Sequence, residues 1–288
     1  MNTSKTTNPT PSILNRSFLA GLAFCSILLA ILYYKTLALL VQDWIILPDF
    51  SHGFLVPFIS LYLVWERRKK LAYPFSPSNW GLLLLASGLI LFLFGRLAAE
   101  YFTQRLSILV VIAGIVLFLL GREHLKTIAF PLLFLVLMIP LPSVFQQEIT
   151  GPMQFFASRC AAQVLELLGI PVLREGNIIH LSNASLEVAE ACSGIRSMIS
   201  LLTLGTLFAY FTRKILWQRL LLVFASLPIA ILVNAFRVSM TAVLVQYYGE
   251  GAAEGFFHEF SGLMLFLIAA ALFYGISLLL SHLTPGQK

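Results

Sequence analysis

Charged residues are scarce in this sequence. Only 11% of its 288 residues are charged, whereas 59% are hydrophobic, and the mean hydropathy is +0.89. A soluble globular domain carries about 25% charged residues, so the composition excludes that class and predicts an integral membrane protein. The expected fold class is an all-α polytopic membrane protein.

Cysteine is also rare, and no two cysteines lie close together in the sequence. Cys25, Cys160 and Cys192 therefore form neither a C-x-x-C redox motif nor a disulfide framework. A single disulfide between Cys160 and Cys192 on the outer side stays open. No compact ligand spacing predicts a metal site, although Cys192, His180 and His258 stay open as a zinc set. We expect no metal and no cofactor.

A basic stripe with interleaved aromatic residues is missing too. The net charge of +6 comes from Lys and Arg in short segments between apolar runs, which the positive-inside rule explains. We therefore expect the lipid bilayer and no nucleic acid as a partner. Oligomeric state cannot be inferred from this pattern.

Long apolar runs are what the sequence does contain. A transmembrane helix needs about 20 apolar residues, and the first run reads as retained rather than as a signal peptide. We expect a disordered cytoplasmic tail at 1–15, a single transmembrane domain at 16–282 and a cytoplasmic tail at 283–288. About eight spans are expected, at 17–41, 47–65, 80–95, 106–120, 126–141, 195–212, 219–245 and 260–281.

The distribution of Lys and Arg predicts the orientation of these spans. Twelve of the 19 lie in the two tails and in alternate connecting segments, such as "ERRKK" (66–70). The opposite segments hold only Arg96, Arg105, Arg159 and Arg174. Because cytoplasmic loops carry the excess of positive charge, both termini are expected inside.

The outer loop at 141–190 is the largest connecting segment. From Gly151-Pro152 onward, "GPMQFFASRCAAQVLELLGI" spaces apolar residues at three and four, which predicts an amphipathic helix on the membrane surface. "NIIHL" (177–181) and "SLEVA" (185–189) flank "SNA", which favours a short β-hairpin before the sixth span. This segment brings "EACSG" (190–194) to the outer rim.

Four chemically distinctive side chains are expected at one height. Arg196 and Arg237 are the arginines within predicted spans, where a cation is costly and usually functional. At 1.5 Å per residue, Arg237 lies about 27 Å along its span from Arg219, near the outer boundary of a ~30 Å core. Cys192 begins the preceding span and His258 precedes the following one. A cation beside a thiol at a helix N-terminus favours the thiolate.

Each of these residues also has a simpler interpretation. Cys192 can be a packing residue, the arginines can be interfacial anchors whose heads reach the polar boundary, and His258 can cap the last helix. Their coincidence in depth and side is what favours a functional site.

Several motifs resemble one known family. "EACSGIRS" (190–197), "NAFRV" (234–238) and "FHEFSG" (257–262) follow one another on successive spans, after "FSHGFLVPFIS" (50–60) and "MIPLP" (138–142). In this order they resemble the exosortase/archaeosortase family of membrane transpeptidases, over residues from about 40 to 275. His258, where archaeal relatives often carry arginine, resembles the bacterial exosortase branch, which implies the cytoplasmic (inner) membrane.

The resemblance implies an activity and its catalytic residues. Members are thought to cleave a C-terminal sorting signal at the outer face; the signal comprises a Pro-Glu-Pro-type motif, a transmembrane helix and a basic tail. Cys192 matches the nucleophile, Arg237 the family arginine and His258 the third catalytic position. A small-molecule transporter and a non-catalytic scaffold of an export complex remain the alternatives.

Supporting residues are expected around these three. Ser193 and Gly194 would offer backbone amides and room for close approach, and Asn234 would orient the family arginine from one turn away. Arg196 would tune the thiolate or pair with the carboxylate of the substrate motif. Glu190 is the alternative holder of the key proton.

Overall fold

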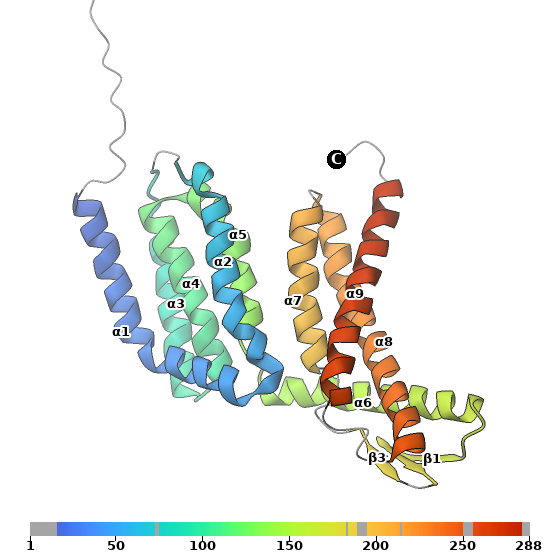
Figure 1. The fold of residues 1–288 in the computed structure, drawn as a ribbon. Helices are drawn as coiled ribbons and strands as arrows, with labels where there is room; N and C mark the ends of the chain where they lie inside the picture. The colour runs from blue at the N-terminus through green and yellow to red at the C-terminus, as the bar shows by residue number, and fades with distance from the viewer. Residues whose placement is uncertain are drawn as a thin grey trace, which may run out of the picture. The chain divides into compact units, whose positions relative to one another are not determined.

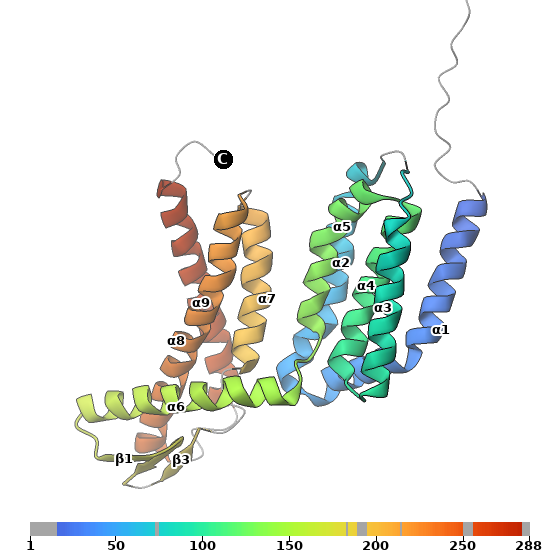
Figure 2. The same cartoon turned by 180° about the vertical axis from the view of Figure 1, so that it is seen from behind.

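The computed structural model describes residues 16–72, 75–182, 184–188, 195–213, 215–249 and 256–283. The chain divides into two compact units, which Figures 1 and 2 show from opposite sides. Unit 1 comprises Met1–Ile46 and Gly53–Pro140, and unit 2 comprises Leu47–His52 and Leu141–Lys288. A single transmembrane domain at 16–282 stays a prediction.

Unit 1 contains the N-terminal helices. Short 3-10 segments follow the first, second and fifth of them, and most of the first segment, residues 48–52, belongs to unit 2. The helices are α1 (Arg16–Ile46), α2 (Leu55–Glu66), α3 (Trp80–Leu97), α4 (Tyr101–Leu119) and α5 (Arg122–Phe134), and the 3-10 segments are η1 (Pro48–Phe54), η2 (Arg68–Ala72) and η3 (Leu135–Met138).

Glycines bring α3 and α4 into close contact. Gly81, Gly88 and Gly95 recur every seven residues on α3 and face α4, and Gly114 faces α3 in return. A Cβ on Gly88 would lie 2.7 Å from Val111 Cγ2, which leaves no room for a side chain. In lipid, where no hydrophobic force drives helices together, such small residues permit the close packing that stabilises a pair.

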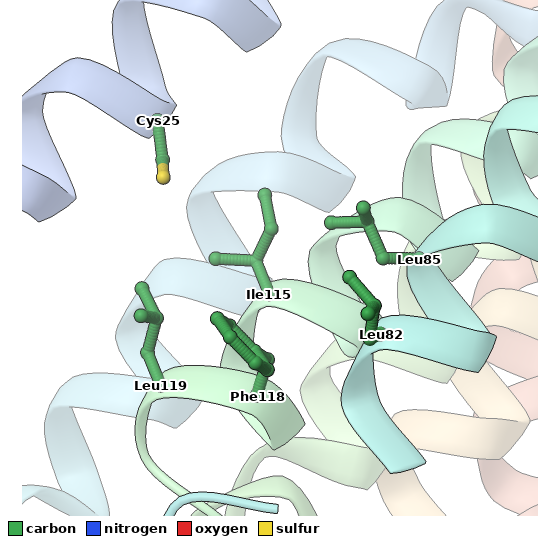
Figure 3. Close-up of a pocket in the computed structure, with 6 residues that line it drawn as sticks. All are labelled: Cys25, Leu82, Leu85, Ile115, Phe118 and Leu119. Atoms are coloured by element: carbon green, nitrogen blue, oxygen red, sulfur yellow. The ribbon is translucent and has the colours of Figure 1, made fainter. Parts of the chain in front are cut away.

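Polar contacts fix the C-terminal half of α1 against α4. Tyr33 and Ser107 share a hydrogen bond of 2.9 Å, and the buried Arg105 guanidinium lies 2.7 Å from the Asp43 carboxylate. Nearer the start of α1 the contact is a pocket of about 220 Å³ (Figure 3). It is lined by Cys25 of α1, Leu82 and Leu85 of α3, and Ile115, Phe118 and Leu119 of α4.

The helices support a polytopic membrane protein, with fewer clear spans than expected. Among the described residues, four segments are long and apolar enough to cross a membrane: Ala23–Ile46, Trp80–Leu97, Tyr101–Leu119 and Leu216–Tyr248. A fifth is obtained if Arg122–Met138 and Ser143–Leu167 form one broken span. The remaining spans of the expected eight stay a prediction.

Unit 2 contains the rest of the chain. Its helices are α6 (Ser143–Leu167), α7 (Ile195–Thr212), α8 (Leu216–Tyr248) and α9 (Phe256–Leu283), and its strands are β1 (Val172–Glu175), β2 (Ile178–Leu181) and β3 (Ser185–Glu187). Helices α7, α8 and α9 all contact one another. Gly205 of α7 lies at their junction, because a Cβ there would be 3.0 Å from Phe273 Cζ on α9 and 3.2 Å from Ser226 Cβ on α8.

The start of α6 differs from the prediction. The sequence places it at Gly151-Pro152, since proline lacks a backbone donor, but the helix begins at Ser143 and continues through Pro152. The Gln146 backbone N–H donates to Pro142 O and its side chain donates to Leu141 O, so the earlier first turn is already stabilised. A proline inside a helix removes one hydrogen bond, and the turns that follow Pro152 are packed through buried residues such as Met153 and Ala157.

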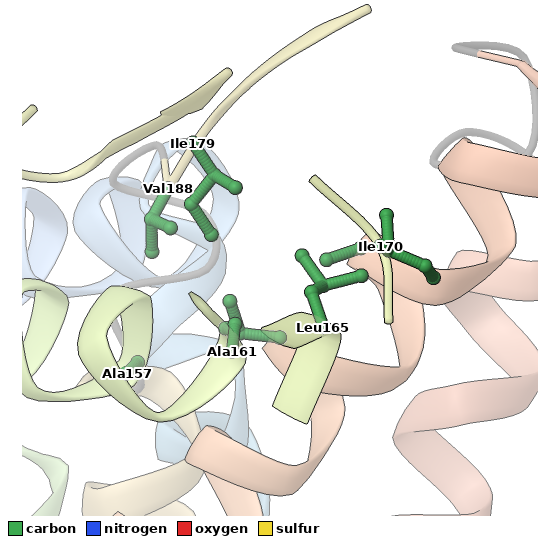
Figure 4. Packing of buried hydrophobic residues seen from close by; sticks show 8 residues of the cluster. Ala157, Ala161, Leu165, Ile170, Ile179 and Val188 are labelled. Atoms are coloured by element: carbon green, nitrogen blue, oxygen red, sulfur yellow. The ribbon is translucent and has the colours of Figure 1, made fainter. Parts of the chain in front are cut away.

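A buried stripe on α6 packs against the sheet and α8 in unit 2. Met153, Ala157, Ala161 and Leu165 recur every four residues, which places them on one helical face. The last three pack with Ile170, with Ile179 of β2, with Val188 just after β3, and with Val238 and Ala242 of α8. Figure 4 shows Ile179 and Val188 side by side over this face.

The sheet occupies the place where the sequence predicts a hairpin. β2 and β3 pair antiparallel, with Ile179 opposite Leu186 and His180 opposite Ser185. The structure adds β1 as a third strand, in the order β1-β2-β3. Ile179 is fully buried between its neighbours, so the sheet is held on α6 and α8 through its central strand.

Candidate active site

Arg237 is a buried cation in the C-terminal half of the long helix α8. Its exposed fraction is 8%, and that of Asn234, one turn earlier, is 1%. Arg237 Nη2 donates a hydrogen bond of 2.9 Å to Asn234 Oδ1. At 1.5 Å per residue, Arg237 lies about 32 Å from the start of α8 at Leu216, which is close to the thickness of a bilayer core.

The position of Arg237 on α8 is stabilised from one side by α6 and the sheet. The next residue, Val238, and Ala242 one turn later are buried in the cluster that α6 and the sheet complete. The small side chains of Ala157 and Ala161 permit α6 to approach α8 closely at this level. Packing thus fixes the helix beside Arg237, and Asn234 holds its guanidinium; such a preorganised donor can stabilise a developing negative charge.

Arg196 lies in the first turn of α7 and forms an ion pair. Its Nε donates to Asp49 Oδ1 across 3.2 Å, and the two side chains are 43% and 29% exposed. Asp49 belongs to η1, and residues 47–52 are part of unit 2. The structure gives Arg196 an internal carboxylate partner; its expected role, to tune a thiolate or bind a substrate carboxylate, stays a prediction.

Asp49 is therefore a residue of this region that sequence reasoning missed. It precedes "FSHGFLVPFIS", a segment noted for its resemblance, but no role was assigned to the carboxylate. The available signal was charge: the loop 42–53 contains two aspartates and no Lys or Arg. Their partners had to come from other segments. His52, half-buried in the same 3-10 segment, lies with its ring 6.3 Å from that of Phe50.

Five expected site residues lie wholly or partly outside the part of the chain that the structure describes. Glu190, Cys192, Ser193 and Gly194 lie outside the described residues. His258 is in the first turn of α9, and only its backbone is described. The structure thus brings α7, α8 and α9 together with Arg196, Asn234 and Arg237 on them. A meeting of the Cys192, Arg237 and His258 side chains stays a prediction.

The described side chains of the possible zinc set and the possible disulfide are His180 and Cys160. His180 Nδ1 and Ser185 Oγ share a hydrogen bond of 2.9 Å, and His180 Nε2 is 3.7 Å from the Glu175 carboxylate. These are contacts between neighbouring strands. Cys160 is a free thiol on α6, as is Cys25 on α1. Within the described ranges, no group of three or more His, Cys, Asp or Glu residues is placed to hold a metal ion.

Comparison with known proteins gives one match. Residues 44–275 match the sequence model of a family described as transmembrane exosortase. The match covers all of the described elements from the end of α1 into α9, including Asn234, Arg237 and the Asp49–Arg196 pair. Curated proteins and solved structures gave no match.

Proposed function

Because this chain belongs to the transmembrane exosortase family, we propose that it is a cysteine-dependent membrane transpeptidase. Its substrates are proteins with a C-terminal sorting signal, which comprises a Pro-Glu-Pro-type motif, a transmembrane helix and a basic tail. The enzyme cleaves next to the motif at the outer face of the membrane and transfers or releases the substrate protein. The observation that carries the proposal is Arg237, a buried cation held by Asn234 on a helix that contacts both α7 and α9.

The proposed setting is a bacterial cytoplasmic membrane crossed about eight times. The excess of Lys and Arg in alternate segments supports termini on the inside. With that orientation α8 runs outward, so Arg237, about 32 Å along the helix, reaches the outer boundary of the bilayer core. α6 and the three-stranded sheet, which pack on Val238 and Ala242 of α8, then lie on the outer side beside the catalytic level. This arrangement leaves the site open to substrates that have already crossed the membrane.

The proposed reaction proceeds through a thioester. The Cys192 thiolate attacks the scissile carbonyl carbon, and the C–N bond breaks as the leaving amine takes a proton from His258. An incoming nucleophile then attacks the thioester, gives its proton to His258 and releases Cys192. Arg237 donates hydrogen bonds to the tetrahedral oxyanion in both steps, a contribution typically worth about 10²–10³ in rate.

The chain offers its own matched controls for testing the nucleophile. Cys192→Ala is compared with Cys25→Ala and Cys160→Ala, which remove the two free thiols. The assay is the conversion of a co-expressed substrate with a C-terminal sorting signal from the precursor to the shorter product on an immunoblot. We expect loss of cleavage in Cys192→Ala alone, at equal protein level.

The other outcome separates the competing classes. Undiminished cleavage in Cys192→Ala overturns the enzyme proposal. A second result would favour a different class of protein. If the wild type does not process the substrate but supports assembly of an export complex, the protein is a scaffold. If it supports uptake of a solute instead, it is a transporter.

A further inference from the structure

The ion pair between Asp49 and Arg196 joins distant parts of the sequence. The two residues are 147 positions apart, and their charged groups meet at 3.2 Å. Asp49 lies in the six-residue segment Leu47–His52, which belongs to unit 2 although α1 and α2 on either side belong to unit 1. The pair therefore fixes this short segment to the first turn of α7.

The position of Arg196 in the sequence gives this contact a functional meaning. Arg196 follows Cys192 by four residues in the sequence. A contact that orients the first turn of α7 therefore also fixes the point at which the preceding segment joins the helix. An arginine with no carboxylate partner would attract the thiolate or an acidic substrate. The Asp49 carboxylate accepts a hydrogen bond from Arg196 Nε, so it offsets part of the positive charge at the start of α7.

We propose that Asp49 is a positioning residue of the active site. This role rests on the proposed function: Asp49 acts through Arg196 and holds the start of α7 in the geometry in which Cys192 reacts. Arg196 is then part of the scaffold of the site. Recognition of the acidic motif falls to other groups.

Neutralising each partner separately distinguishes these roles. In a background with Cys25→Ala and Cys160→Ala, Asp49→Asn leaves Arg196 uncompensated, whereas Arg196→Gln removes the cation. Both variants should lower kcat by about ten- to a hundredfold, because small misplacements of reacting groups cost that much, with KM nearly unchanged. Glu123→Gln, which neutralises one side of the exposed Glu123–Lys126 pair, is the matched control and should keep wild-type kcat.

Alkylation of the single remaining thiol supplies a second readout. The rate of Cys192 alkylation by an impermeant reagent is measured against pH. Asp49→Asn should move the midpoint to lower pH and Arg196→Gln to higher pH, since a nearby cation favours the thiolate. A contact that only stabilised the fold would move neither midpoint.

The charge-swapped double variant Asp49→Arg with Arg196→Asp completes the test. It should recover at least part of the kcat lost in either single charge reversal, and it decides the matter if Asp49→Asn fails to fold. Recovery no better than the single reversals overturns the inference, as does a raised KM with unchanged kcat in Arg196→Gln, which would make Arg196 a substrate-binding residue. Cys192→Ala distinguishes failure of the proposed function from failure of this inference. If Cys192→Ala cleaves normally, the proposed function is wrong. If Cys192→Ala is inactive but Asp49→Asn is fully active, only the positioning role is refuted.

Discussion

Gly114→Ala tests whether close contact between α3 and α4 stabilises unit 1. The new Cβ would lie 2.5 Å from the Leu85 backbone nitrogen and 2.7 Å from Leu85 Cα. Ordinary contacts of this kind are about 3.5 Å, so the two helices must separate locally by about 1 Å. Backbone atoms cannot yield as a flexible side chain does.

The cost follows from this separation. Overpacking by one methyl group in a tight contact typically costs about 1–3 kcal/mol, and a loss of about 2 kcal/mol corresponds to roughly 4–8 °C in Tm for a protein of this size. We expect that decrease in thermal unfolding followed by circular dichroism in one detergent. The folded fraction should keep its activity, because Gly114 contacts α3 rather than α7, α8 or α9.

The matched control is Gly275→Ala on α9. A Cβ there has no heavy atom within 4 Å, so this variant reports the gain in helix propensity, up to about 1 kcal/mol, without any clash. The difference between the two variants isolates the steric cost. If Gly114→Ala melts at the same temperature as Gly275→Ala, the close packing of α3 on α4 does not stabilise the protein and the reasoning is wrong.

Two further predictions concern single side chains. Asn234→Leu removes the acceptor of a buried arginine, a loss of about 2 kcal/mol; kcat/KM should fall roughly 30-fold, and an unchanged value would show that Arg237 is oriented by other groups. Burial raises the pKa of Glu100, but hydrogen bonds from Thr103 and Phe102 and the nearby Arg105 outweigh it and hold the pKa below its ordinary 4.5. The contribution of this carboxylate to stability is therefore complete above pH 4.5 and is lost as the pH falls through the lower folded value. Glu100→Gln should cost about 1 kcal/mol at neutral pH and should flatten this acid-dependent decrease in Tm; an identical pH dependence in both proteins would contradict it.

The sequence was a good guide to the features that follow from periodicity and local motifs. Membership of the exosortase family is confirmed over residues 44–275, and the helical, multi-pass character is clear from composition. The Asn234–Arg237 contact could be anticipated because residues three apart on a helix lie on the same face. The predicted start of α6 at Gly151 was wrong, since a local proline signal was overridden by packing over the whole helix.

Contacts between distant segments could not be obtained in that way. Asp43 and Asp49 both lie in the stretch 42–53, which contains no Lys or Arg. The sequence thus indicates that each carboxylate needs a partner, but not which one. Their actual partners are Arg105 and Arg196, on helices that the chain reaches only after several turns. Likewise, the seven-residue spacing of Gly81, Gly88 and Gly95 is visible in the sequence, but the helix that it faces is known only from the fold.

The assignment of residues 47–52 to unit 2 affects how parts of two related proteins can be combined in one chain. They are encoded within the N-terminal half but belong to the C-terminal unit, so a chimera that joins residues 1–140 of one exosortase to residues 141–288 of another mixes the two sources inside unit 2. Such a hybrid keeps a matched acid and base only if both parents carry that pairing at positions 49 and 196. In recombination or in divergence, these two positions should change together.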